Sequence, residues 1–178
     1  VMPVISEDRR MTIMQGRHPV LEESLKKSGR KIIPLDLELG PEQRMIIISG
    51  PNAGGKSVAM KTTGLLQYMF QCGFLVPAAE GTVLFPFDEV LADIGDQQSI
   101  ENDLSTYSSH LLNMKHFMQS GNERTLILID EFGSGTEPES GGAIAEAVLE
   151  VLNQSMCYGV VTTHYFNLKM LASNHTGV

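Results

Sequence analysis

Residues 45–57 read Met45-Ile46-Ile47-Ile48-Ser49-Gly50-Pro51-Asn52-Ala53-Gly54-Gly55-Lys56-Ser57. The apolar run at the start is typical of a strand buried on both faces of a parallel sheet. The next eight residues match G-x-x-x-x-G-K-[ST], and apolar side chains at approximately helical spacing predict a helix from Lys56 to Phe70. Strand, glycine-rich loop and helix form the context in which backbone N–H groups and a helix N-terminus bind phosphate.

The residue types of this loop suit a nucleoside triphosphate with Mg²⁺. Lys56 is expected to reach the β- and γ-phosphates, and the Ser57 hydroxyl to ligate the metal. The alternative is a plain glycine-rich turn after a strand, which the strand-loop-helix context disfavours. The residues predicted to bind the phosphates are Gly50, Pro51, Asn52, Ala53, Gly54, Gly55, Lys56 and Ser57.

A second motif places two adjacent carboxylates at the end of an apolar strand, in Thr125-Leu126-Ile127-Leu128-Ile129-Asp130-Glu131. We expect Asp130 to hold Mg²⁺ and Glu131 to orient and deprotonate the attacking water. A solvated turn is the alternative, and the upstream phosphate loop makes it the weaker one. A water-activating Glu favours a hydrolase over a small-molecule kinase, and the chain lacks the Asn/Thr-Lys-x-Asp guanine reader of a GTPase.

Two polar segments add candidate site residues. His164 follows a third apolar strand and is placed to touch a γ-phosphate, although a lone His there is usually a hydrogen-bonded turn residue. The hydroxyl cluster at 104–110 opens a helical pattern and predicts a Ser/Thr N-cap. Whether its Ser105 and Thr106 also face a phosphate stays open.

The rest of the chain alternates short apolar runs with helical patterns, which favours a parallel α/β domain. We predict one domain over residues 1–178, with a mostly parallel central sheet, helices on both faces and the nucleotide at the carboxyl edge. The opening strands are expected to form a small antiparallel layer. Strands are predicted at 1–5, 11–14, 34–39, 45–48, 126–129 and 158–162, and helices at 56–70, at 141–152 and after 104–110.

Composition limits the function classes. The 178 residues are 42% hydrophobic with a mean hydropathy of −0.02, which is typical of a globular protein and not of a disordered or membrane protein. A net charge of −8 argues against a basic nucleic-acid footprint, and residues 88–103 carry several acidic side chains with no Lys or Arg. That stretch would repel a DNA backbone or is simply a solvated loop face. Two cysteines without metal spacing, and no signal or membrane segment, favour the cytoplasm.

The order of phosphate loop, hydroxyl-rich helix start, Asp-Glu strand end and His resembles that of ABC-type ATPases. Six blocks in order more specifically resemble the ATPase domain of the MutS family, and three of them resemble its second bacterial branch, the recombination-suppressing paralogue. The six blocks are Gly16-Arg17-His18-Pro19-Val20-Leu21-Glu22, the phosphate loop, the segment 93–101, the cluster 104–110, the segment 130–138 and the segment 162–168.

The resemblance implies a P-loop NTPase fold of ABC type and a Mg²⁺-dependent ATPase. It implies that Gly50–Ser57 binds ATP, Asp130 the metal, Glu131 the water and His164 the γ-phosphate. It further implies a homodimer in which Ser105 and Thr106 act on the partner subunit's nucleotide and residues 133–136 lie along the seam. Ile32, Ile33 and Pro34 are plausible stand-ins for the residues that hold the adenine.

The resemblance also implies that DNA is bound by regions outside this chain, which begins at Val1 and is expected to be a fragment of a longer protein. Nuclease activity is not expected in it. The target class is recombination intermediates or mismatched or branched DNA, with a ribosome-rescue factor or a mismatch-repair MutS proper as alternatives. Ala53, Asp103-Leu104 and Ser134 depart from the mismatch-repair pattern and disfavour the last alternative.

Overall fold

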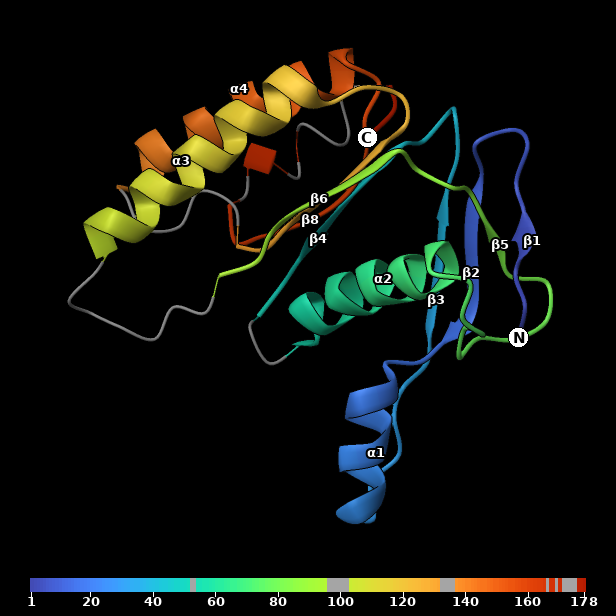
Figure 1. The fold of residues 1–178 in the computed structure, drawn as a ribbon. Coiled ribbons are helices and arrows are strands. Elements are labelled where there is room, and N and C mark those ends of the chain that lie inside the picture. Colours follow the sequence, from blue (N-terminus) through green and yellow to red (C-terminus); the bar gives the residue numbers. More distant parts are fainter. Residues whose placement is uncertain (52–53, 96–102, 132–136, 166, 169, 171–175) are drawn as a thin grey trace. The chain divides into compact units, whose positions relative to one another are not determined.

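The computed structural model describes residues 1–51, 54–95, 103–131, 137–165, 167–168, 170 and 176–178. Within these residues it contains four α-helices and two four-stranded sheets (Figure 1). The chain forms two compact units, one made of Val1–Pro41 with Ser57–Pro86 and the other of Glu42–Lys56 with Phe87–Val178. The predicted α/β class with a parallel sheet is confirmed.

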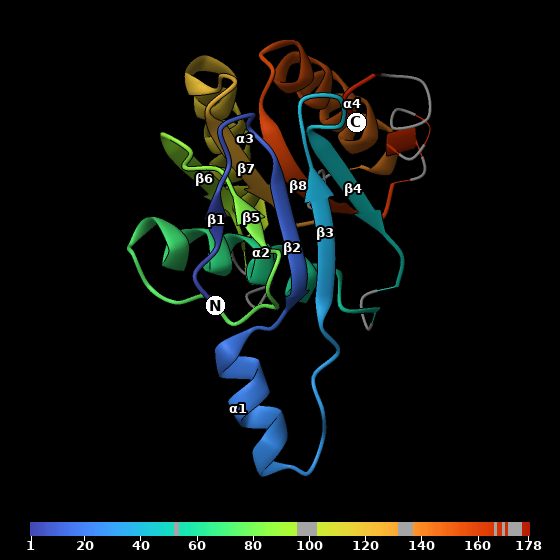
Figure 2. The ribbon, with the colours of Figure 1, turned by 90° about the vertical axis from the view of Figure 1, so that its right-hand side faces the viewer.

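The first unit contains the sheet expected from the opening strands. Antiparallel pairing joins β2 to both β3 and β5, which agrees with the predicted small layer, while β1 pairs with β5 in parallel. Figure 2 shows these strands lying next to one another in the order β1-β5-β2-β3. Their bounds are β1 (Val4–Ile5), β2 (Met11–Gly16), β3 (Leu35–Leu39) and β5 (Val83–Leu84).

A helix that was not predicted follows β2. Helix α1 spans Pro19–Lys27 and is capped by His18, whose Nδ1 accepts a hydrogen bond from the Leu21 backbone N–H at 3.3 Å. Pro19 occupies the first helical turn, where its missing N–H costs nothing. His18 and Pro19, which stand in the first of the six blocks quoted above, therefore begin a helix.

The second unit is built on a parallel sheet with strand order β4-β8-β7-β6. Strands β4 (Met45–Ser49), β7 (Thr125–Ile129) and β8 (Tyr158–Thr163) lie where the apolar runs predicted strands. Strand β6 (Glu89–Asp93) falls in the acidic stretch, so reading that stretch as a loop face is wrong for these five residues. Strand pairing with β7 decides their conformation despite the charges at both ends.

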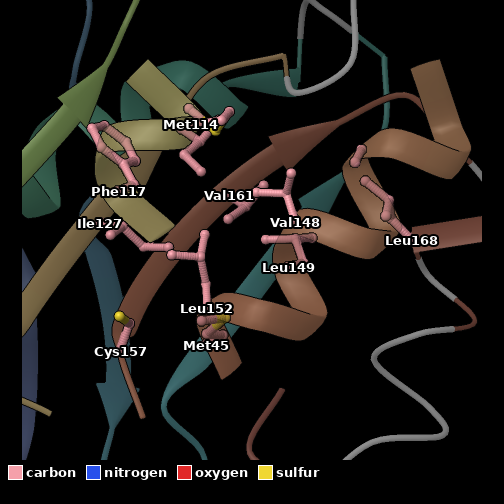
Figure 3. Close-up of a cluster of buried hydrophobic side chains, with 12 residues drawn as sticks. Met45, Met114, Phe117, Ile127, Val148, Leu149, Leu152, Cys157, Val161 and Leu168 are labelled. Carbon is pink, nitrogen blue, oxygen red and sulfur yellow. The ribbon is translucent and has the colours of Figure 1, made fainter. Parts of the chain in front are cut away.

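Helices α3 (Asp103–Ser120) and α4 (Pro138–Gln154) lie side by side and share a buried apolar cluster with the parallel sheet (Figure 3). Helix α4 starts three residues before the predicted 141–152, with Pro138 in its first turn. Packing against the strands stabilises both helices and fixes them to this sheet. The cluster draws Met114 and Phe117 from α3, Val148, Leu149 and Leu152 from α4, and Met45, Ile127, Cys157 and Val161 from the strands and their ends.

Candidate nucleotide site

The phosphate loop joins β4 to helix α2 (Lys56–Gln71). Gly50 and Gly55 have φ of +149° and +79°, conformations that L side chains rarely adopt. A Cβ on either would meet nothing within 4 Å, so backbone conformation rather than crowding favours glycine at both positions. The Gly54 N–H donates to the Pro51 carbonyl at 3.0 Å, while Asn52 and Ala53 lie outside the described residues.

Lys56 is the first residue of α2 and only 4% exposed. Its Nζ donates to the Gly50 carbonyl at 2.7 Å, which closes the loop on itself. A buried ammonium must be hydrogen-bonded or paired with an anion, so this nitrogen is suited to a phosphate placed at the loop. Ser57 follows it in the first turn of α2.

Asp130 comes directly after β7 and is 8% exposed. The Thr162 hydroxyl of β8 donates to Asp130 Oδ1 at 2.6 Å and accepts the Glu131 backbone N–H at 2.8 Å. One hydroxyl thus fixes both predicted acidic residues to the neighbouring strand. Its position follows from the parallel register, in which Ile129 pairs with Val161.

Glu131 has a positive φ of +49°, which is unusual for a residue with a side chain and turns the chain at the end of β7. Strained backbone of this kind gathers at functional sites. Its Oε1 lies 3.6 Å from His164 Nε2, and both side chains are partly exposed, at 25% and 44%. A carboxylate next to an imidazole at a solvent-reachable strand end can accept or relay a proton.

The strand order brings most predicted site residues to one edge of the sheet. In the order β4-β8-β7, the loop containing Lys56, then His164, then Asp130 and Glu131 follow the carboxyl ends of three adjacent strands. Ligands of open α/β sheets bind at this edge. Carboxylate oxygens such as those of Asp130 are ligands that Mg²⁺ prefers, so this residue fits the metal.

Ser105 and Thr106 lie inside the first turn of α3, which begins at Asp103. The predicted Ser/Thr N-cap is therefore wrong, because the helix starts earlier in the sequence, at Asp103. Whether these two hydroxyls face a phosphate stays a prediction. Residues 133–136 lie outside the described residues.

Sequence reasoning missed a polar cluster at the end of β6. Asp93 is 5% exposed, and its carboxylate binds His110 Nδ1 at 2.5 Å and Asn113 Nδ2 at 2.8 Å. The hydrogen bond with Asp93 raises the pKa of His110, while partial burial of the ring acts in the opposite direction. The i, i+3 spacing of the two α3 residues could have signalled a shared partner.

Thr162 was also missed, although it stands in a quoted block. A hydroxyl near the carboxyl end of a buried strand is the available signal, because such a group needs a hydrogen-bond partner. Its two partners are visible only once β7 and β8 are paired.

Two further features are absent from the described residues. No cluster of three or more His, Cys, Asp or Glu side chains there could hold a metal ion. In the same part of the chain, no helix has the length and apolar character needed to cross a membrane.

Comparison with known proteins gives a consistent result. The family described as MutS domain V matches residues 46–178. The chain is 43% identical over its whole length to "Endonuclease MutS2" of Ruminiclostridium cellulolyticum, covering 22% of that protein. It is 45% identical over 98% of its length to the protein of that name from Clostridium botulinum (strain Eklund 17B / Type B), and 45% identical over its whole length to that of Alkaliphilus oremlandii.

In both of these the chain covers about a fifth of the relative's length, 21% and 22%. The family match covers well over half of the chain and begins in β4, immediately before the phosphate loop. This chain therefore belongs to the MutS family, and along its whole length it is similar to proteins of the second bacterial branch.

Proposed function

We propose that this chain is the ATP-binding and ATP-hydrolysing domain of a MutS-like protein that acts on recombination intermediates or on mismatched or branched DNA. The observation that carries the hydrolytic part is the single edge shared by the phosphate loop, the Asp130-Glu131 pair and His164. A module that only binds a nucleotide would need the phosphate loop and no water-activating group. A hydrolase also needs a group that activates water, and Glu131 next to His164 supplies a candidate.

Each residue then has a role set by its position. The loop and Lys56 hold the β- and γ-phosphates, and Ser57 and Asp130 hold Mg²⁺, which neutralises charge on the phosphate oxygens. Thr162 keeps the Asp130 carboxylate in place by its 2.6 Å hydrogen bond. Glu131 orients and deprotonates water, and His164 contacts the γ-phosphate.

The proposed DNA contact lies outside this chain. The chain carries 13 Lys and Arg against 21 Asp and Glu, and such a surface attracts a phosphate backbone poorly. The relatives are about five times as long as the region they share with this chain, which leaves room for a DNA-binding part. With the full-length protein, we expect retention of branched DNA. Retention of ribosomes instead would contradict the proposed target class.

The hydrolytic part is tested by phosphate release from Mg-ATP with the wild type and Lys56→Ala of the full-length protein. We expect the variant to lose most ATP binding and hydrolysis, because the cation facing the phosphates is removed. Lys61→Ala, on the same helix, is the matched control and should retain both. A Lys56→Ala variant that binds and hydrolyses ATP like the wild type would contradict the proposed site.

A further inference from the structure

A buried carboxylate next to the proposed site is bound by two donors from one helix. Both oxygens of Asp93 are used, Oδ2 by His110 Nδ1 at 2.5 Å and Oδ1 by Asn113 Nδ2 at 2.8 Å. The Asp93 side chain is 6% exposed and that of His110 is 22% exposed. Charge-assisted hydrogen bonds of this kind are among the stronger ones in proteins.

The same aspartate is joined to the Asp130-Glu131 strand end through its backbone. The Asp93 carbonyl accepts the Asp130 N–H at 2.9 Å, as the ladder between β6 and β7 continues to their carboxyl ends. Asp93 therefore contacts α3 by its side chain and the proposed metal-binding residue by its main chain.

Close packing holds the His110 ring at this place. A Cβ added to Gly95 would meet His110 Cε1 at 3.2 Å and Nε2 at 3.4 Å, tighter than most contacts of real side chains. The ring thus lies between the Asp93 carboxylate and the backbone of the segment after β6. A glycine at 95 leaves room for it.

Helix α3 carries the two hydroxyl residues predicted to act at a nucleotide. His110 and Asn113 stand at i and i+3, so they share one face of the helix. Sliding or tilting α3 would break both bonds and leave a buried carboxylate without donors, which is strongly unfavourable. The cluster therefore resists movement of the first turn of α3 relative to the β6–β7 edge.

We propose that Asp93, His110 and Asn113 form a positioning group for ATP hydrolysis. The group aligns the first turn of α3 with the strand end bearing Asp130 and Glu131. This inference rests on the proposed ATPase function and adds residues to which no role was assigned from the sequence. In this proposal, each of the three residues acts through the elements that it holds and not directly on the substrate.

The test uses the full-length protein with His110→Ala and His110→Asn. Asn places an amide nitrogen near the position of Nδ1 and keeps a neutral donor to Asp93, whereas Ala removes it. We expect His110→Ala to lower kcat about tenfold, the effect of one charge-assisted hydrogen bond, with KM for ATP changed less than about twofold. His110→Asn should recover most of kcat. His116→Ala, an exposed histidine on the same helix, should match the wild type.

A pH profile separates positioning from general support of the fold. Among the described residues, the titratable group in contact with the His110 ring is Asp93 of β6. The charged pair forms below the raised pKa of His110, so kcat of the wild type should decline as pH rises through that value. The decline should be absent in His110→Asn, which cannot be charged.

Each outcome of these experiments supports or overturns the positioning role. A His110→Ala variant with wild-type kcat and pH profile overturns the positioning role while the ATPase proposal stands. Equal losses in His110→Ala and His110→Asn, with raised KM and lower thermal stability, would show a merely structural role. If the wild type itself releases no phosphate from Mg-ATP, the ATPase proposal fails and the positioning role fails with it.

Discussion

At the scale of single residues, Thr162 is the side chain on which the strand end depends most. Its hydroxyl donates to Asp130 and accepts from the Glu131 N–H, and the residue is fully buried. Thr162→Val keeps the shape but removes both bonds. We expect the free energy of unfolding to fall by about 1–3 kcal/mol, because buried groups lose their partners. We also expect kcat for ATP to fall, because the Asp130 carboxylate is released.

Denaturant unfolding and steady-state phosphate release measure these two effects. Thr63→Val is the matched control, since Thr63 is also fully buried but its hydroxyl donates to the Ala59 carbonyl of its own helix. It should change stability less and leave kcat unaltered. A Thr162→Val protein with the stability and kcat of the control would refute the role given to this hydroxyl.

The two cysteines differ in reactivity for a physical reason. Cys72 is exposed, whereas burial of Cys157 raises its pKa from 9.0 to about 11. Because the thiolate is the nucleophile, Cys72 should be alkylated by iodoacetamide at pH 8 and Cys157 only after unfolding. Mass spectrometry of peptides from native and denatured samples checks this. Rapid labelling of Cys157 in the folded protein would contradict the burial of this thiol in the core.

The raised pKa of Cys157 also predicts how the free energy of unfolding changes with pH. The neutral thiol is favoured in the folded state, so its contribution to stability is complete below pH 9.0. That contribution is lost as pH rises toward about 11. Denaturant unfolding measured across this interval should show the loss, and Cys157→Ala should show less of it.

The phosphate loop and the Asp-Glu pair could be located in the sequence because each is a short motif of neighbouring residues. The places of Lys56 and Asp130 beyond the ends of β4 and β7 could be predicted because each follows an apolar run, while their roles stay predictions. Thr162, His110 and Asp93 could not be assigned, because their partners lie 17 to 32 residues away in sequence. Only the strand register and the packing of α3 bring these groups together.

At the scale of elements, the pairing of β7 with β8 requires a glycine. A Cβ at Gly159 would lie 2.5 Å from Ile127 Cγ1 and 3.3 Å from the Ile127 carbonyl oxygen. We expect Gly159→Ala to destabilise the protein by about 1–3 kcal/mol through overpacking. Gly40→Ala, with nothing within 4 Å of its added Cβ, is the control and should be nearly neutral. Equal thermal midpoints of both variants, by circular dichroism, would contradict the close packing.

Element prediction succeeded where burial on both faces gives a continuous apolar run, as in β4, β7 and β8. It failed for the two-residue strand β5, for β6 and for α1. Strand β6 is an edge strand with a charged residue at each end, and α1 has no buried residue, so neither carries the apolar pattern of a core element. Their conformations come from pairing with β7 and from the cap at His18.

At the scale of the whole molecule, the two compact units interleave along the chain. The second unit includes Lys56 and the first resumes at Ser57, so the first turn of α2 contains the boundary. The predicted antiparallel layer and parallel sheet thus belong to different units. A linear reading of the sequence could predict that both sheets exist, but not all of their strands or which distant segments join to form a unit.

The proposed homodimer makes a prediction at this scale. If Ser105 and Thr106 complete the partner subunit's site, ATP turnover per subunit should rise with protein concentration and then level off. The wild type and Ser105→Ala should be assayed over a wide concentration range, with mass measured by light scattering. We expect the variant to have lower turnover even at high concentration. Turnover independent of concentration, with a monomer throughout, would refute completion of the site by a partner.

The central claim is that the strand end at Asp130-Glu131 hydrolyses ATP held by the phosphate loop. The most direct measurement is single-turnover phosphate release from Mg-ATP by the wild type and Glu131→Gln at matched ATP occupancy. The amide keeps the size of the side chain but cannot accept a proton from water. Glu131→Gln should bind ATP as tightly as the wild type and release phosphate at least about a hundredfold more slowly, the ordinary contribution of a general base. Phosphate release at the wild-type rate would contradict the claim.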